Sequence, residues 1–190
     1  MENNDQQLVV EYLAGNKQAL TELIGRHLSL VYRYAFRLTR DTESAEDVTQ
    51  ETLVKMWRSI KKYNPQQNFR TWLLSIAHNT ALDILRKRKD FIFSELGNEE
   101  GQGFSEMIAD PAPLAPEIFA RAEQEKLLNH ALEQLPISSR EIVALYHESG
   151  LTFAEIGVIL NKPLNTVKSQ YRRVLLSLRK ILKEQKVGLN

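Results

Sequence analysis

Residues 166–180, TVKSQYRRVLLSLRK, combine basic side chains with a helical apolar pattern and include no acidic residue. Apolar residues recur at spacings of three and four, which predicts one buried helix face. The side chains that fall towards the other face are Lys168, Ser169, Arg172 and Arg173. Guanidinium and ammonium groups donate to guanine edges and to phosphates, so this face could contact DNA. The alternative is a solvated helix face, which is what most runs of charge on a helix are.

The residues before this segment favour the DNA interpretation. Thr152-x-x-Glu155 is a capping-box pattern that opens a short helix, and residues 161–163, NKP, form a turn. Asn165 or Thr166 is then expected to cap the basic helix. An earlier capping-box pattern, Ser138-x-x-Glu141, predicts one more helix, which Gly150 ends. Two short helices joined by a tight turn, the second one basic, are typical of a helix-turn-helix motif.

A second candidate surface is acidic. Residues 41–51, DTESAEDVTQE, contain five acidic residues and no basic one. Carboxylates are favoured in the first turn of a helix by its dipole, which explains part of this charge without any function. Gln50 and Glu51 lie beyond that turn, so the spacing also allows a protein-binding face.

A third candidate is the segment 63–89, in which a polar loop with Tyr63 and Phe69 precedes a helix ending in RKRK. Aromatic and amide groups beside a basic tract suit single-stranded DNA, because bases stack on rings while cations follow the backbone. The alternative is that the aromatic residues are core and RKRK is a solvated helix end. We expect Trp72 in the core, whereas loop residues such as Asn64 more often carry function.

Catalysis and metal binding find little support in the sequence. The histidines at 27, 78, 130 and 147 are scattered, and cysteine is absent. No HExxH, GxSxG or glycine-rich phosphate loop occurs. We therefore expect a protein that is not an enzyme, has no cofactor and binds no small-molecule substrate.

The elements that must position these surfaces are all helices. Helical apolar patterns cover 8–38, 44–60 and 71–88, and none alternates as a strand would. Between 94 and 125 there are three glycines, three prolines, eight acidic residues and one basic residue, a composition typical of a linker. We predict an all-α fold of two small helical domains, 1–93 and 123–190, joined by a flexible acidic linker at 94–122.

The whole chain of 190 residues has a net charge of only +1, which argues against indiscriminate DNA binding. Its start lacks the pattern of a signal peptide, and no apolar run approaches the roughly 20 residues of a membrane span. The expected location is the cytoplasm.

Three of these stretches, in this order, resemble the extracytoplasmic-function (ECF) sigma factors of bacterial RNA polymerase. DVTQETLVKMW (47–57) resembles region 2.2, FRTWLLSIAHNTALDILRKRK (69–89) resembles regions 2.3–2.4, and residues 135–180 resemble region 4. The sequence departs from the common family pattern at two places. Its loop reads NPQQNF rather than a form richer in Gly and Asp, and Asn165 stands where glycine is frequent in the family.

The resemblance implies a partner or a DNA element for each surface. The residues implied in docking on the β′ clamp helices of core polymerase are Asp47, Gln50 and Glu51. The residues implied in capturing the melted −10 strand are Tyr63, Asn64, Phe69, Arg70, Asn79, Arg86 and Arg88. The residues implied in reading the −35 element are Lys168, Ser169, Arg172 and Arg173. The β flap of the polymerase and an anti-sigma factor are further expected partners.

Two other functions remain open at this point. One is a helix-turn-helix regulator that binds an operator by itself, against which the long first domain speaks. The other is a protein-interaction adaptor without DNA function. We predict a sigma factor that directs core polymerase to promoters and assists DNA melting.

Overall fold

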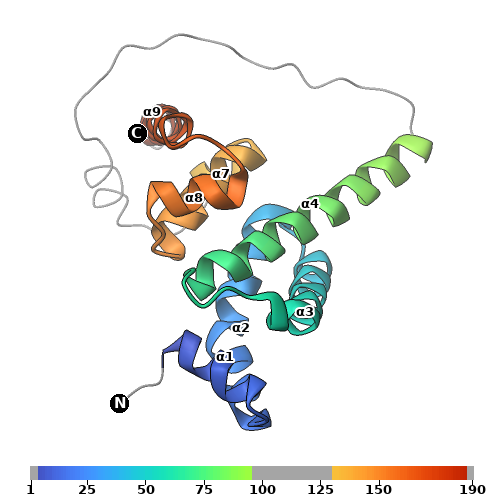
Figure 1. Cartoon of the computed structure of the whole chain (residues 1–190). Coiled ribbons are helices and arrows are strands. Elements are labelled where there is room, and N and C mark those ends of the chain that lie inside the picture. The colour runs from blue at the N-terminus through green and yellow to red at the C-terminus, as the bar shows by residue number, and fades with distance from the viewer. Residues whose placement is uncertain (1–3, 96–129, 188–190) are drawn as a thin grey trace.

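The computed structural model describes residues 4–95 and 130–187, with side chains for 4–87 and 130–184. All regular elements in these ranges are helices, as predicted (Figure 1). They form a first unit, residues 4–95, and a second unit, residues 130–187. The predicted linker, 94–122, lies almost wholly outside the described residues.

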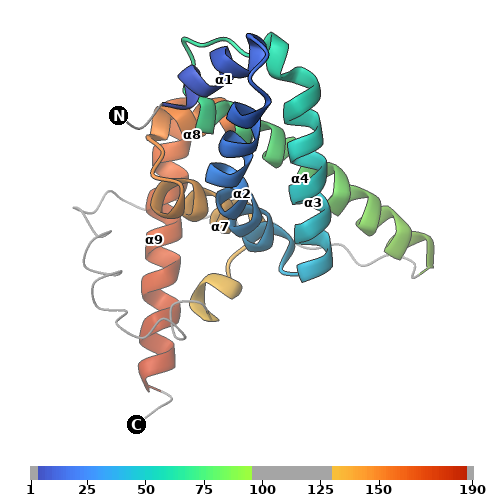
Figure 2. The same cartoon turned by 90° about the horizontal axis from the view of Figure 1, so that it is seen from below.

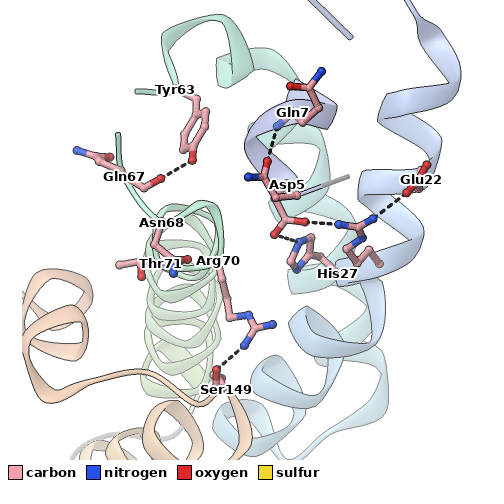
Figure 3. Close-up of polar contacts among 12 residues, drawn as sticks. Asp5, Gln7, Glu22, His27, Tyr63, Gln67, Asn68, Arg70, Thr71 and Ser149 are labelled. Atoms are coloured by element: carbon pink, nitrogen blue, oxygen red, sulfur yellow. Dashed lines mark hydrogen bonds and ion pairs between the residues drawn. The ribbon is translucent and has the colours of Figure 1, made fainter. Parts of the chain in front are cut away.

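The first predicted helix, 8–38, is in fact two helices, α1 (Asp5–Leu13) and α2 (Lys17–Thr39). Gly15 separates them with a φ of +106°, a conformation that side chains with a Cβ rarely adopt. The Asn16 side chain then accepts from the backbone N–H of Gln18 and caps α2. Asp5 ties the two helices together again, because its carboxylate binds both Arg26, at 3.0 Å, and His27, at 2.8 Å (Figure 3).

The rest of the first unit consists of α3 (Thr42–Ser59), a 3-10 turn (Ile60–Lys62) and α4 (Phe69–Glu95). The Asp41 carboxylate caps α3 by accepting from the backbone N–H and hydroxyl of Ser44. Trp57 belongs to the apolar pattern predicted over 44–60, which would place it on the buried side of this helix, but its side chain is 51% exposed. Its indole N–H donates to the Tyr12 hydroxyl at 2.9 Å, so the ring lies across the surface of α1.

The second unit contains α7 (Ile137–Val143), a π-helical turn (Ala144–Glu148), α8 (Phe153–Leu160) and α9 (Leu164–Val187). α7 runs directly into the π-helical turn, and Gly150, with a φ of +65°, ends this continuous helical segment as predicted. The capping box of Thr152 and Glu155 is confirmed, because side chain and backbone bond reciprocally. Asn161, also in the left-handed region, turns the chain from α8 towards α9.

Two predicted caps of this unit are wrong. α7 has Pro136 at its N-cap and no capping side chain, so Ser138 and Glu141 form no capping box. α9 begins at Leu164, and the backbone N–H of Val167 bonds to the Pro163 carbonyl at 3.1 Å. Asn165 and Thr166 are therefore inside the helix rather than at its cap.

The two units pack against each other through α4 with α8 and α2 with α7. Figures 1 and 2 show the second unit beside the N-terminal half of α4, while the C-terminal half of α4 extends away from the other helices. α9 packs on α7 and α8. No helix in the described ranges combines the length and the apolar character needed to cross a bilayer.

Two histidines give the fold a pH dependence. Burial lowers the pKa of His27, reinforced by the charges of Arg70 and Arg26 and opposed by Asp5, and burial also lowers the pKa of His147. Both pKa values in the folded state thus lie below the value of about 6.5 for a free imidazole, so the unfolded chain binds more protons in this window. We expect the free energy of unfolding to fall as the pH drops below about 6.5.

The measurement is urea unfolding followed by circular dichroism at several pH values between about 7.5 and 5.5. The double variant His27→Gln/His147→Gln should show a shallower pH dependence than the wild type. His130→Gln is the control, because this imidazole is 64% exposed. Equal slopes for the wild type and the double variant would contradict the assignment.

Candidate functional site

The exposed face of α3 carries the first predicted group. Asp47, Gln50 and Glu51 are all exposed, and Glu51 lies 3.6 Å from Lys55 one turn later. Val48, Thr52 and Met56 anchor the opposite side of the helix in the core. The structure therefore presents the three polar side chains together on one surface.

Sequence reasoning missed the neighbouring contribution of α2. A shallow groove of about 730 Å³ runs between α2 and α3, and Gln50 lies on its rim. The residues of α2 that line the groove are Leu28, Ser29, Tyr32 and Arg33. Leu28 is 45% exposed. The only feature of the sequence that indicates this exposure is its position off the apolar stripe of the predicted helix 8–38. The face thus combines apolar side chains on α2 with polar and acidic ones on α3, a composition suited to binding another protein.

The loop before α4 differs from the prediction in its aromatic residues. Phe69 is 1% exposed and Tyr63 is 6% exposed, so neither ring is available for stacking on a base in this arrangement. The two rings meet edge to face at 5.4 Å, and Trp72, half-buried, packs on both. The Tyr63 hydroxyl donates to the Gln67 carbonyl at 2.5 Å (Figure 3). Burial of the large apolar area of these rings stabilises the folded loop from its inner side.

The polar residues of the same segment are the exposed ones. Asn64, Arg70, Asn79 and Arg86 all reach the surface of the first unit. Arg86 pairs with Asp83 on the extension of α4, at 3.0 Å. Arg88 lies in the same helix, but its side chain is outside the described ones. The candidate strand-binding surface therefore consists of exposed amide and guanidinium groups, and the buried rings of Tyr63 and Phe69 lie beneath it.

The third predicted group is confirmed in its exposure. Lys168, Ser169, Arg172 and Arg173 are exposed on α9, whereas Val167, Tyr171, Val174 and Leu178 are buried. Burial, together with the charge of Tyr146, raises the pKa of Tyr171 to about 12, and its hydroxyl lies 2.8 Å from His147 Nε2. This buried contact helps to fix the rotation of α9 about its axis, so its basic face points to solvent.

A buried carboxylate joins the two units. Glu141 of α7 is 5% exposed and accepts from the Tyr34 hydroxyl of α2 at 2.5 Å. His78 Nδ1 of α4 lies 2.5 Å from the same oxygen. Burial raises the pKa of Tyr34 well above its ordinary value, and the charge of Glu141 raises it further, so the phenol remains a donor.

Further polar contacts cross the same boundary close to the predicted strand-binding surface. The guanidinium of Arg70 donates to the Ser149 carbonyl at 3.0 Å, and Figure 3 shows it reaching from α4 towards the second unit. The Thr71 hydroxyl donates to Glu155 at 3.1 Å. Burial alone would raise the pKa of Glu155, but hydrogen bonds from Thr152 and Thr71 and the charge of Arg70 lower it. The carboxylate is therefore held in its charged, accepting form.

At the other end of the boundary is a cleft of about 410 Å³ with charged walls. Arg37 binds Glu148 at 2.6 Å, and Arg40 lies 3.5 Å from Glu133. Arg140 is buried there, and burial lowers its pKa, with the charge of Arg40 acting in the same direction. Because these ion pairs also cross between the units, they add to the contact made by Glu141.

Within the described residues, no group of three or more His, Asp or Glu side chains is arranged to hold a metal ion. Of the three surfaces described so far, two are rich in cationic or amide donors, and one combines acidic with apolar side chains.

Comparison with known proteins identifies the family. The family models for Sigma-70 region 2 and Sigma-70 region 4 match residues 23–91 and 125–178. The chain belongs to the ECF sigma factor family. The ECF sigma factor SigW of Bacillus subtilis is 28% identical over 90% of this chain and 92% of its own length. SigE of Mycolicibacterium smegmatis is 36% identical over 80% of this chain and 57% of its own length. The protein is thus a transcription initiation factor that acts with RNA polymerase at promoters.

Two solved structures share the fold of this sigma factor. CnrH, in complex with the cytosolic domain of CnrY, matches with a TM-score of 0.65 over 95% of this chain and 97% of that chain, at 22% identity. RpoE of Bartonella quintana, in complex with the anti-sigma factor NepR, matches with a TM-score of 0.68 over 86% of this chain and 96% of that chain, at 23% identity.

The buried carboxylate gives a test of the contact between the units. Glu141→Ala removes the acceptor that the Tyr34 hydroxyl and His78 share and leaves them only their own long contact of 3.4 Å, and loss of a buried hydrogen-bond partner costs about 1–3 kcal/mol. We expect a lower free energy of unfolding and a longer, broader distance distribution between the units. The chain has no cysteine, so spin labels on cysteines introduced at Lys61 and Lys180, both exposed, report that distance in a pulsed electron resonance experiment.

Glu22→Ala is the matched control. It removes an ion pair with Arg26 on the exposed face of a single helix, so the distance between the units should not change. An unchanged distance distribution in Glu141→Ala would show that this carboxylate does not hold the units together.

Proposed function

We propose that this sigma factor divides its work among three surfaces. Asp47, Gln50 and Glu51, with the groove between α2 and α3, bind the β′ clamp helices of core polymerase. The loop 63–68 and α4 capture the melted −10 strand, and α9 reads the −35 element. In this proposal the first domain is 1–93, the linker 94–122 and the second domain 123–190, and the second domain also contacts the β flap.

The observation that carries the proposal is the match of both sigma regions to units that expose these surfaces. The α9 face is basic and free of apolar residues along Lys168, Ser169 and Arg172, as a helix that enters the major groove requires. The α3 face is polar and borders an apolar groove, as a protein-docking surface requires. The two kinds of surface match the two kinds of partner that a sigma factor joins.

Capture of the −10 strand is assigned to the exposed polar groups. Asn64, Arg70 and Asn79 can hydrogen-bond to unstacked bases and their phosphates, with Arg86 and Arg88 following the backbone along α4. Tyr63 and Phe69 act as positioning residues, because burial of their rings fixes the loop. We assign no bond-making or bond-breaking step to the protein, since capture of unpaired bases is enough to shift the melting equilibrium. It acts in the cytoplasm, where bacterial RNA polymerase works.

The contact between the units adds a condition to this mechanism. While Arg70 donates from Nη1 to the Ser149 carbonyl, its guanidinium is held against the second unit and cannot turn fully towards the −10 strand. The units therefore separate, at least around Ser149, when strand capture begins. Core polymerase favours the separated arrangement if it binds the two domains better apart than together.

Run-off transcription with core polymerase tests the division of work. Asp47→Ala/Gln50→Ala should weaken assembly with core, because it removes polar contacts of the docking face. Arg172→Ala/Arg173→Ala should leave assembly intact and lower promoter-specific transcription at least about tenfold, since a good base contact contributes about 1–3 kcal/mol. Core assembly is measured by fluorescence anisotropy of the labelled sigma factor, and transcription by the specific product.

Glu184→Gln, an exposed residue near the end of α9, is the control and should change neither quantity. Full transcription by the arginine variant would favour an adaptor without DNA function. Tight, sequence-specific DNA binding by the protein without core polymerase would favour an independent regulator.

Regulation by an anti-sigma factor is part of the same proposal. One support is that RpoE was solved with the anti-sigma factor NepR, and CnrH with the cytosolic domain of CnrY. The other is that Leu28 and Phe36 of α2 are exposed in this chain, at 45% and 42%. An inhibitor that covers these side chains would also cover the groove used by core. We expect a host protein that binds the purified sigma factor to abolish run-off transcription and to be displaced by excess core.

The matched variant is Leu28→Ser, which should weaken the inhibitor without unfolding the chain because the side chain is exposed. If no host protein inhibits transcription by the purified sigma factor, or if inhibition does not compete with core, this regulation is refuted.

A further inference from the structure

Asn165 lies on the exposed face of α9 near the start of the helix, and the predicted set of DNA-reading residues does not include it. It is the second residue of the helix and is exposed. Ser169 and Arg172 follow it at spacings of four and seven, which places all three on one stripe of the helix. The buried residues Val167 and Tyr171 lie on the opposite side.

The Asn165 amide has no structural use in the described part of the chain. It does not cap α9, because the helix begins at Leu164 and its first backbone bond runs from Val167 to Pro163. None of the hydrogen bonds among the described residues involves this side chain. The Ser169 hydroxyl, in contrast, already donates to the Thr166 carbonyl at 2.9 Å. An exposed amide with both its donor and acceptor groups free can therefore engage a ligand.

The turn before α9 holds this amide in a fixed place. The backbone N–H of Lys162 bonds to the Gly157 carbonyl at 2.9 Å, and a Cβ added at Gly157 would lie 2.8 Å from the Lys162 carbonyl. The ammonium of Lys162 donates to Gln170 at 3.1 Å, across the first turns of α9. The start of α9 is thus packed directly on α8, so the position of Asn165 relative to the rest of the second unit is set before DNA binds.

We propose that Asn165 reads an adenine at one position of the −35 element. The inference rests on the proposed function of α9 as the helix that enters the major groove, where the N-terminal residues meet base edges. The amide oxygen of asparagine accepts from the adenine N6 amino group, and the amide N–H donates to N7. Arg172, further along the same stripe, and Lys168, beside it, hold the phosphates and guanine edges that flank this position.

The test measures base preference in the complete holoenzyme. Core polymerase loaded with this sigma factor selects from promoter DNA randomised across the −35 element, and the enriched sequences are read. The wild type should prefer adenine at one position by about 5- to 150-fold, the discrimination of one good bidentate contact. Asn165→Ala should lose the preference at that position and keep the preferences at all others.

Asn165→Asp sharpens the result because it changes the chemistry without disturbing the helix. A carboxylate in the first turn is favoured by the helix dipole, so the fold is maintained. It accepts from the cytosine amino group and is repelled by adenine N7, so the preference should move from adenine to cytosine at the same position. Ser177→Ala, at an exposed position about three turns further along α9, is the control and should leave the whole profile unchanged.

Each other outcome has a distinct meaning. A sharp wild-type profile that Asn165→Ala leaves unchanged refutes the assignment of Asn165 while α9 remains a reader. Uniform weakening across all sequences would show that Asn165 contacts only phosphate, and also refutes it. A flat wild-type profile at the −35 element would refute the proposed reading role of α9 itself.

Discussion

The buried carboxylate of Glu141 is the interaction on which the arrangement of the two units depends. A charged group taken out of water is costly unless it is paired and hydrogen-bonded. Here both partners, Tyr34 and His78, come from the other unit. Because Glu141 is satisfied only when α7 lies against α2 and α4, its burial selects one relative orientation out of the many that two linked helical units could adopt.

This orientation affects the two proposed DNA-binding surfaces differently. Arg70 and Thr71, at the start of α4, donate to groups of the second unit. The basic face of α9 remains exposed, because α9 packs on α7 and α8 through its opposite side. The closed arrangement therefore occupies part of the surface proposed for strand capture and leaves the surface proposed for duplex reading open. In the proposed mechanism, packing of the units thus separates duplex recognition from strand capture in the free protein.

The sequence predicted the helices and the family well, and the use of particular polar and aromatic side chains less well. Thr152-x-x-Glu155 and Ser138-x-x-Glu141 are equivalent local patterns, yet only the first is a capping box. The reason lies in a distant part of the chain, since Tyr34 and His78 bind the second glutamate. Phe69 was assigned to DNA on its position beside a polar loop, but its ring is in the core. Exposure of the α3 and α9 faces, which needs only helical spacing, was predictable from sequence.

The energetics of this contact suit a protein that has to open. Each hydrogen bond exchanged with water contributes only about 0.5–1.5 kcal/mol net, because water satisfies the same groups after separation. The polar contacts of Glu141, Arg37, Arg70 and Thr71 therefore sum to a few kcal/mol at most, although their geometry is specific. In the proposed mechanism, core polymerase overcomes this difference by binding the two domains better apart than together. An apolar contact of the same area would hold the units together more strongly, since it has no such compensation from water. Polar contacts thus give the closed state one defined geometry.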